Sequence, residues 1–104
     1  MTIDIPPRDG VIALVGTAKP LPHRAAELRA LLTSFVEPTR AEPGALAYDL
    51  HEDDAGDLVF TERWRSEADL RAHLALPHMV AFQTSRMEYL AEDLRISWLT
   101  PIEP

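Results

Sequence analysis

Apolar and polar residues follow two different periods along the chain, and together these periods predict four strands and two helical regions. The run 11–18 is apolar and rich in β-branched residues, which is typical of a strand buried on both faces. Apolar residues then recur every three or four positions over 28–36, which predicts a helix that begins near Pro22 and ends near Pro38.

Period-two patterns return in the middle of the chain. Leu46, Tyr48 and Leu50 alternate with more polar residues, and a second alternating run covers 58–64. The acidic segment 53–57 between them predicts a hairpin turn, because Asp and Gly tolerate the backbone that such a turn needs.

The last third of the chain predicts a broken helix and a final strand. Ser66 is placed as the N-cap of a short helix, and Pro77 divides this helix from a second segment. Alternation over 94–99 predicts the last strand. One side of the second helical segment is expected to carry Met79, Phe82, Gln83, Arg86, Met87 and Leu90.

The order β-α-β-β-α-β predicts an α+β, ferredoxin-like domain with a four-stranded antiparallel sheet and helices on one face. We expect one domain over 11–100, a flexible N-terminal arm over 1–10 and a C-terminal tail over 101–104. Ile3 and Ile5 are apolar enough to pin the arm to a surface. The opposite face of the sheet also carries apolar residues, so we expect a homodimer with two sheets packed back to back.

Composition excludes several classes of function. The chain has 104 residues and a net charge of −7, which argues against nucleic acid and anionic membranes as partners. It has no cysteine, and its four histidines do not stand at a metal-ligand spacing. No apolar run approaches the about 20 residues that span a bilayer, and no signal core is present, which favours the cytoplasm.

The candidate chemistry is concentrated between the third strand and the helix after it. Glu62 and Trp64 stand two residues apart and therefore share a strand face, and His73 falls on the apolar side of the helix. We expect the three side chains to meet in one pocket. The alternatives are a buried histidine bonded to a backbone carbonyl, a core tryptophan and a salt-bridged glutamate. A buried Glu62 needs a partner, for which His73 and Arg86 are the candidates.

These residues belong to a longer ordered pattern. Its parts are Pro43-Gly44-x-Leu46-x-Tyr48, Glu62-x-Trp64-x-Ser66, Leu70-x-x-His73 and a later aromatic, Phe82. With this pattern the chain from 11 to about 99 resembles the antibiotic biosynthesis monooxygenase family of dimeric α/β barrels, the group that includes quinol monooxygenases. The resemblance implies a small pocket between sheet and helices. Some members of the family oxidise phenols, quinols or anthrones with molecular oxygen and no metal or flavin.

We therefore expect a cofactor-independent monooxygenase that acts on a small aromatic or quinol-type molecule, with molecular oxygen as co-substrate. His73 would take the phenolic proton, and Glu62 is the second candidate catalytic residue. The candidate substrate-binding residues are Trp64, Tyr48, Phe82, Met79 and Gln83. A non-catalytic ligand-binding module and an oxygen-independent isomerase or cyclase are the alternatives. Gln83 stands where haem-degrading relatives carry an axial histidine, which argues against haem breakdown.

Overall fold

The structure, a computed structural model, describes residues 3–102 and contains a four-stranded antiparallel sheet. Its strand order is β2-β3-β1-β4, so the first and third strands occupy the centre. The strands are β1 (Ile12–Ala18), β2 (Ala45–Glu52), β3 (Leu58–Trp64) and β4 (Arg95–Leu99).

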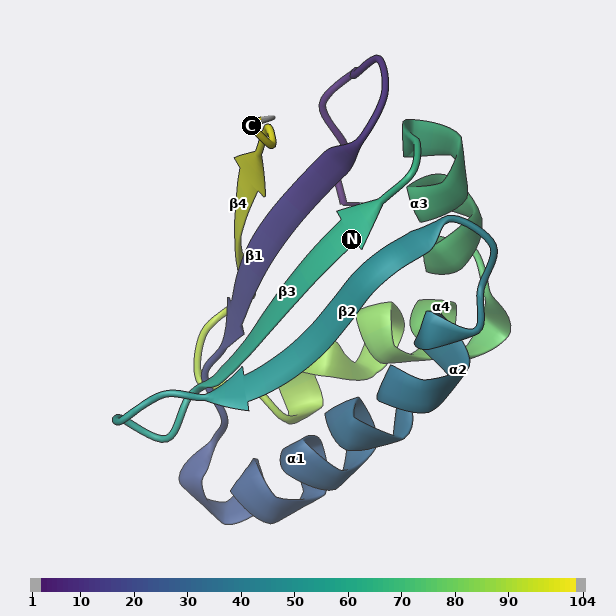
Figure 1. The fold of residues 1–104 in the computed structure, drawn as a ribbon. Helices are drawn as coiled ribbons and strands as arrows, with labels where there is room; N and C mark the ends of the chain where they lie inside the picture. The colour runs from purple at the N-terminus through teal and green to yellow at the C-terminus, as the bar shows by residue number, and fades with distance from the viewer. Residues whose placement is uncertain (1–2, 103–104) are drawn as a thin grey trace.

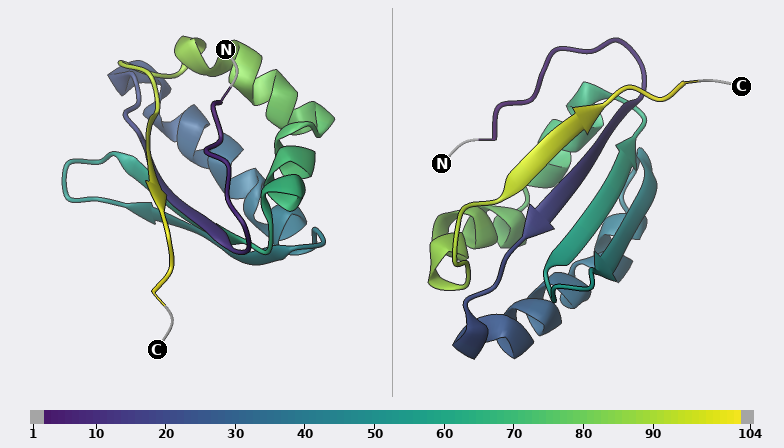
Figure 2. Two further views of the ribbon diagram at one scale, coloured as in Figure 1. Left: turned by 90° about the horizontal axis from the view of Figure 1, so that it is seen from above. Right: turned by 90° about the vertical axis from the view of Figure 1, so that its left-hand side faces the viewer.

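The helices all cover one face of this sheet (Figures 1 and 2). They are η1 (Pro22–Arg24), α1 (Ala25–Ser34), α2 (Val36–Arg40), α3 (Glu67–Leu74), α4 (Pro77–Ser85) and η2 (Arg86–Glu88). The predicted ferredoxin-like order is therefore confirmed. The hydrophobic core lies between the two layers, with Trp64, Ile12 and Leu28 completely buried.

The first helical region differs from the prediction at its C-terminal end. α1 ends at Ser34, and Phe35 separates it from a further short helix, α2. Pro38 lies inside α2 as its third residue and does not end the helix. This position suits proline, because the first N–H groups of a helix have no acceptor within the helix.

Two apolar side chains lie in the solvent where the sequence pattern predicted burial. A register shift in β2 between Ala45 and Ala47 turns Leu46 outward, and this side chain is 53% exposed. Met87 is 47% exposed, because the chain tightens from α4 into the 3₁₀ turn η2 and leaves the helical register.

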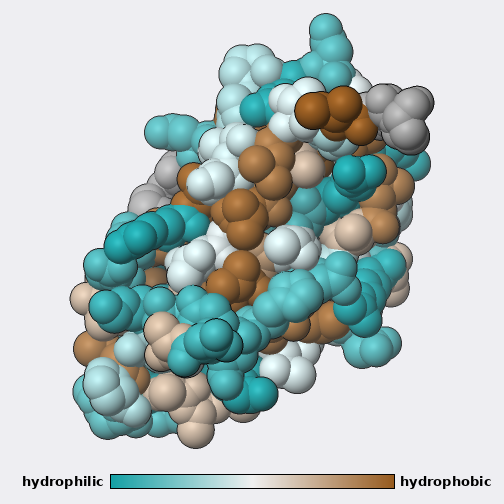
Figure 3. All heavy atoms as spheres, turned by 60° about the vertical axis from the view of Figure 1, so that its left-hand side comes forward, coloured by the Kyte–Doolittle hydropathy of each residue, from teal (hydrophilic) through white to brown (hydrophobic). Residues whose placement is uncertain are grey.

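The outer face of the sheet is mixed in character. Strand pairing places Ala13, Val15 and Thr17 of β1 on this face, opposite polar residues such as Arg63 and Ser97. Val15 and Thr17 are half-buried, so the expectation that β1 is buried on both faces is only partly met. Figure 3 shows apolar side chains in a narrow band bordered by polar ones. The homodimer stays a prediction.

Residues 3–10 form neither helix nor strand and follow the helix side of the sheet (Figure 2). Ile5 is 8% exposed, and Ile3 packs against the core cluster. Arg8 donates a hydrogen bond to the backbone oxygen of Leu99, which ties the segment to the end of β4.

Candidate functional site

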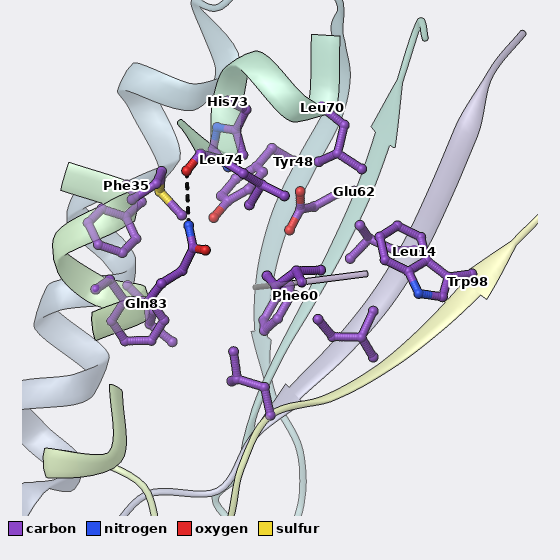
Figure 4. Close-up of a pocket in the computed structure, with 16 residues that line it drawn as sticks. Leu14, Phe35, Tyr48, Phe60, Glu62, Leu70, His73, Leu74, Gln83 and Trp98 are labelled. Atoms are coloured by element: carbon purple, nitrogen blue, oxygen red, sulfur yellow. Dashed lines mark hydrogen bonds between the residues drawn. The ribbon is translucent and has the colours of Figure 1, made fainter. Parts of the chain in front are cut away.

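A cavity of about 50 Å³ lies between the sheet and the helices (Figure 4). Its walls are mostly leucines, isoleucines and aromatic rings, including Phe35, Phe60 and Trp98. Ile3 of the N-terminal segment lines it as well. The polar or titratable side chains Tyr48, Glu62, His73 and Gln83 are also part of the lining. The predicted pocket is therefore present, and it is small and apolar.

Glu62 is a carboxyl group held inside an apolar wall. It is 9% exposed, and its Oε1 accepts a hydrogen bond of 2.9 Å from Nε1 of Trp64. Figure 4 shows the carboxylate pointing into the space between Tyr48 and Phe60. Burial raises the pKa of Glu62 to about 7, with a smaller contribution from the negative charge of Glu42.

Trp64 lies behind the cavity and not in its wall. It is completely buried, and its indole supports both candidate catalytic groups by donating to Glu62 and packing at a tilt against His73. The ring centroids of Trp64 and His73 are 4.7 Å apart. Trp64, which the sequence analysis placed among the substrate-binding residues, therefore stands behind the side chains that line the cavity.

His73 reaches the site from α3. Ser66 caps this helix by accepting a hydrogen bond from the backbone N–H of Asp69, as predicted. His73 is 1% exposed, and its Nδ1 lies 2.9 Å from Oε2 and 3.1 Å from Oε1 of Glu42. Burial lowers the pKa of His73 below its usual value, and the negative charge of Glu42 opposes this shift only in part.

The remaining predicted binding residues lie around these two groups. Tyr48 is buried and forms a T-shaped ring pair with His73, and burial raises the pKa of its hydroxyl. Met79 and Phe82 of α4 line the cavity. The side-chain amide of Gln83 lines it too, and donates a hydrogen bond of 3.0 Å to the backbone oxygen of Leu74 (Figure 4).

The predicted partners of Glu62 were wrong. Its partner is Trp64, whereas His73 is paired with Glu42 and the guanidinium of Arg86 binds Asp93. The sequence contains no signal for Glu42, since this residue stands in the loop before β2, where neither helical nor strand periodicity applies.

A tight contact between this loop and the start of α3 brings Glu42 to His73. The backbone oxygen of Gly44 accepts a hydrogen bond of 2.8 Å from the N–H of Arg65. Gly44 has a φ of +83°, and a Cβ atom there would lie 2.4 Å from Asp69. Only glycine meets both demands without strain, so Gly44 fixes the path of the loop beside the helix.

Two further features of the described part of the chain bear on function. Within residues 3–102, no group of three or more His, Cys, Asp or Glu side chains is arranged to hold a metal ion. None of the helices in this range has the length and apolar character that crossing a bilayer requires.

The fold and the site define a class of small α+β proteins with an enclosed, largely apolar pocket between sheet and helices. The chain belongs to the antibiotic biosynthesis monooxygenase family, whose model matches residues 11–85. It is 37% identical over 93 residues to the Mycobacterium tuberculosis protein named "Putative monooxygenase Rv0793", a match that covers 88% of this chain and 92% of the relative.

Solved structures agree with this assignment. The structure of Rv0793 superposes with a TM-score of 0.85 at 35% identity and covers 90% of this chain and 97% of the other. That of PA3566 from Pseudomonas aeruginosa has a TM-score of 0.83 at 31% identity, with coverages of 91% and 97%. The family and the names of its relatives support a monooxygenase-type function.

Proposed function

We propose that this protein oxidises a small, electron-rich aromatic molecule of the phenol or anthrone type with molecular oxygen, without a metal or a flavin. The observation that carries the proposal is the Glu62 carboxyl group, which is almost fully enclosed by apolar and aromatic walls and has a pKa of about 7. An acidic aromatic substrate needs a group that accepts its proton and apolar walls that hold its ring, and this site combines the two.

The site residues would act on the proton of the substrate. A base works best when its pKa is near the working pH, a condition that Glu62 meets. His73 is the second acceptor, since burial keeps its imidazole neutral near pH 7. The apolar walls exclude water and leave the substrate anion poorly solvated and electron-rich.

The electrons for the reaction come from the substrate itself. A phenol with a free para position, or an anthrone with its CH₂ group, reacts with one O₂ to give the quinone and one water. One oxygen atom enters the ring carbon as a carbonyl, the other leaves as water, and the substrate supplies all four electrons. The protein needs to bind the ring, remove the proton and keep bulk water out.

The present cavity must expand before a ring can enter. A volume of about 50 Å³ is well below the roughly 150 Å³ of an engineered apolar cavity that binds benzene. Ile3 belongs to a segment without secondary structure, so it is the lining side chain that we expect to move first.

Oxygen uptake with 1-naphthol and anthrone tests the proposal. We expect one O₂ consumed per quinone formed, with no hydrogen peroxide, whereas uncatalysed autoxidation of a hydroquinone releases peroxide. Glu62→Gln and His73→Ala are each expected to slow turnover by about 100-fold or more, the usual effect of losing a general base. His51→Ala is the matched control, since His51 is exposed on the outer face of β2.

Three outcomes would overturn the proposal. Equal rates of oxygen uptake in the wild type, Glu62→Gln and His73→Ala would show that neither residue takes the substrate proton. Binding of the aromatic probes without oxygen uptake would favour a ligand-binding module. Product formation under anaerobic conditions would favour an isomerase or cyclase.

A further inference from the structure

We propose that Glu42 is a positioning residue for His73: its carboxylate holds the imidazole proton on Nδ1 and leaves Nε2 as the unprotonated nitrogen for a ligand. Glu42 does not appear among the residues that line the cavity, whereas His73 does. The role of Glu42 in proton transfer rests on the proposed function, whereas the assignment of the His73 tautomer does not.

The geometry of the pair fixes the position of the proton. Both carboxylate oxygens of Glu42 lie within hydrogen-bond distance of Nδ1, and the two side chains are 15% and 1% exposed. An ionised carboxylate can only accept, so Nδ1 must donate. Because burial disfavours a second proton on the ring, the imidazole is neutral and Nε2 keeps its lone pair.

The loop places Glu42 at a point where one charge acts on several groups. Its negative charge favours the protonated forms of His73, Glu62 and Tyr48, the three titratable side chains in the cavity wall. From α4, His78 acts on His73 in the opposite direction and disfavours its charged form. Glu42 therefore sets both the tautomer of the imidazole and the electrostatic background of the site.

Nitrogen-15 NMR of the histidine rings tests the tautomer directly and needs no substrate. In the wild type between pH 6 and 8, we expect the His73 signal, assigned by its loss in His73→Asn, to show a protonated Nδ1 and an unprotonated Nε2. Glu42→Gln keeps an acceptor oxygen and is expected to retain this tautomer. Glu42→Leu removes the acceptor and is expected to shift His73 towards the Nε2-protonated form.

A control variant and two results that would overturn the proposal complete the NMR test. Glu37→Gln alters an exposed glutamate of α2 and should leave the His73 spectrum unchanged. A wild-type His73 protonated on Nε2 would overturn the proposal even if Glu42→Leu fails to fold, and so would an unchanged tautomer in a folded Glu42→Leu.

The NMR result is also separable from the test of the proposed function. If the tautomer is as expected but no oxygen uptake occurs, the proposed function fails and the positioning role of Glu42 stands. If turnover occurs, Glu42→Gln should retain far more of it than Glu42→Leu, because the glutamine still orients the imidazole.

Discussion

Replacing Glu62 with glutamine should stabilise the protein at high pH and have little effect at low pH. The folded state raises the pKa of this carboxyl from 4.5 to about 7, so between these values the folded protein holds a proton that the unfolded chain has released. The stability of the wild type therefore falls as the pH rises through this window. The difference between the two values corresponds to roughly 3 kcal/mol.

The glutamine variant isolates this effect because it is a close mimic of the protonated acid. Its amide oxygen can still accept the hydrogen bond from Trp64 Nε1, and it has no proton to lose. His73 contributes the opposite slope below pH 6.5, because its lowered pKa destabilises the folded state in acid. Both proteins contain His73, so its contribution largely cancels in their difference.

Urea unfolding at several pH values measures this difference. With an m-value of about 1.5 kcal/mol/M, the midpoint of Glu62→Gln should exceed that of the wild type by about 2 M at pH 8 and converge with it near pH 4.5. Both proteins are compared at one concentration, and Glu37→Gln serves as the exposed control. A difference that stays constant from pH 5 to pH 8 would refute the reasoning, since it would show that Glu62 ionises alike in both states.

Three further predictions concern the cavity and the outer face. Ile3→Ala should increase the affinity for 1-naphthol about tenfold or more in calorimetry, because the ligand no longer displaces a side chain whose burial is worth about 1.5–3 kcal/mol. Ile102→Ala is the control, since Ile102 is 95% exposed and its loss should leave the affinity unchanged. Gly16→Ala places a Cβ atom 2.1 Å from the Phe60 ring, so we expect a stability loss of about 1–3 kcal/mol and weaker ligand binding. For the predicted homodimer, light scattering should give twice the chain mass of 11.6 kDa, and Val15→Glu should lower the measured mass to that of a single chain. A wild type with the mass of a single chain would contradict the dimer.

Local periodicity was sufficient for the parts of the site that lie on regular elements. Glu62 and Trp64 share the helix side of β3 because residues two apart in a strand without a register shift point to the same face. The capping residue Ser66 sets the start of α3 and thereby the inward direction of His73. The position of all three side chains follows from patterns that extend over fewer than 15 residues.

The contacts that the sequence did not reveal depend on segments without a period. Glu42 meets His73 only because the loop before β2 lies against the start of α3, a tertiary contact that depends on the backbone of Gly44. The volume of the cavity depends in the same way on where Ile3 packs. Leu46 shows that a regular strand pattern can also mislead. Its alternation with Tyr48 predicts burial, but a register shift in β2 turns its side chain outward.

Burial moves the pKa values of the two candidate catalytic groups in opposite directions, so that near pH 7 His73 is neutral and Glu62 is divided between its protonated and ionised forms. It raises the pKa of Glu62 and lowers that of His73, because each charged form loses its hydration. A protonated Glu62 can donate to a ligand oxygen, and its deprotonated form can accept the same proton at little cost. The instability of about 3 kcal/mol that Glu62 brings at high pH is thus the thermodynamic counterpart of its ability to exchange a proton with a buried ligand.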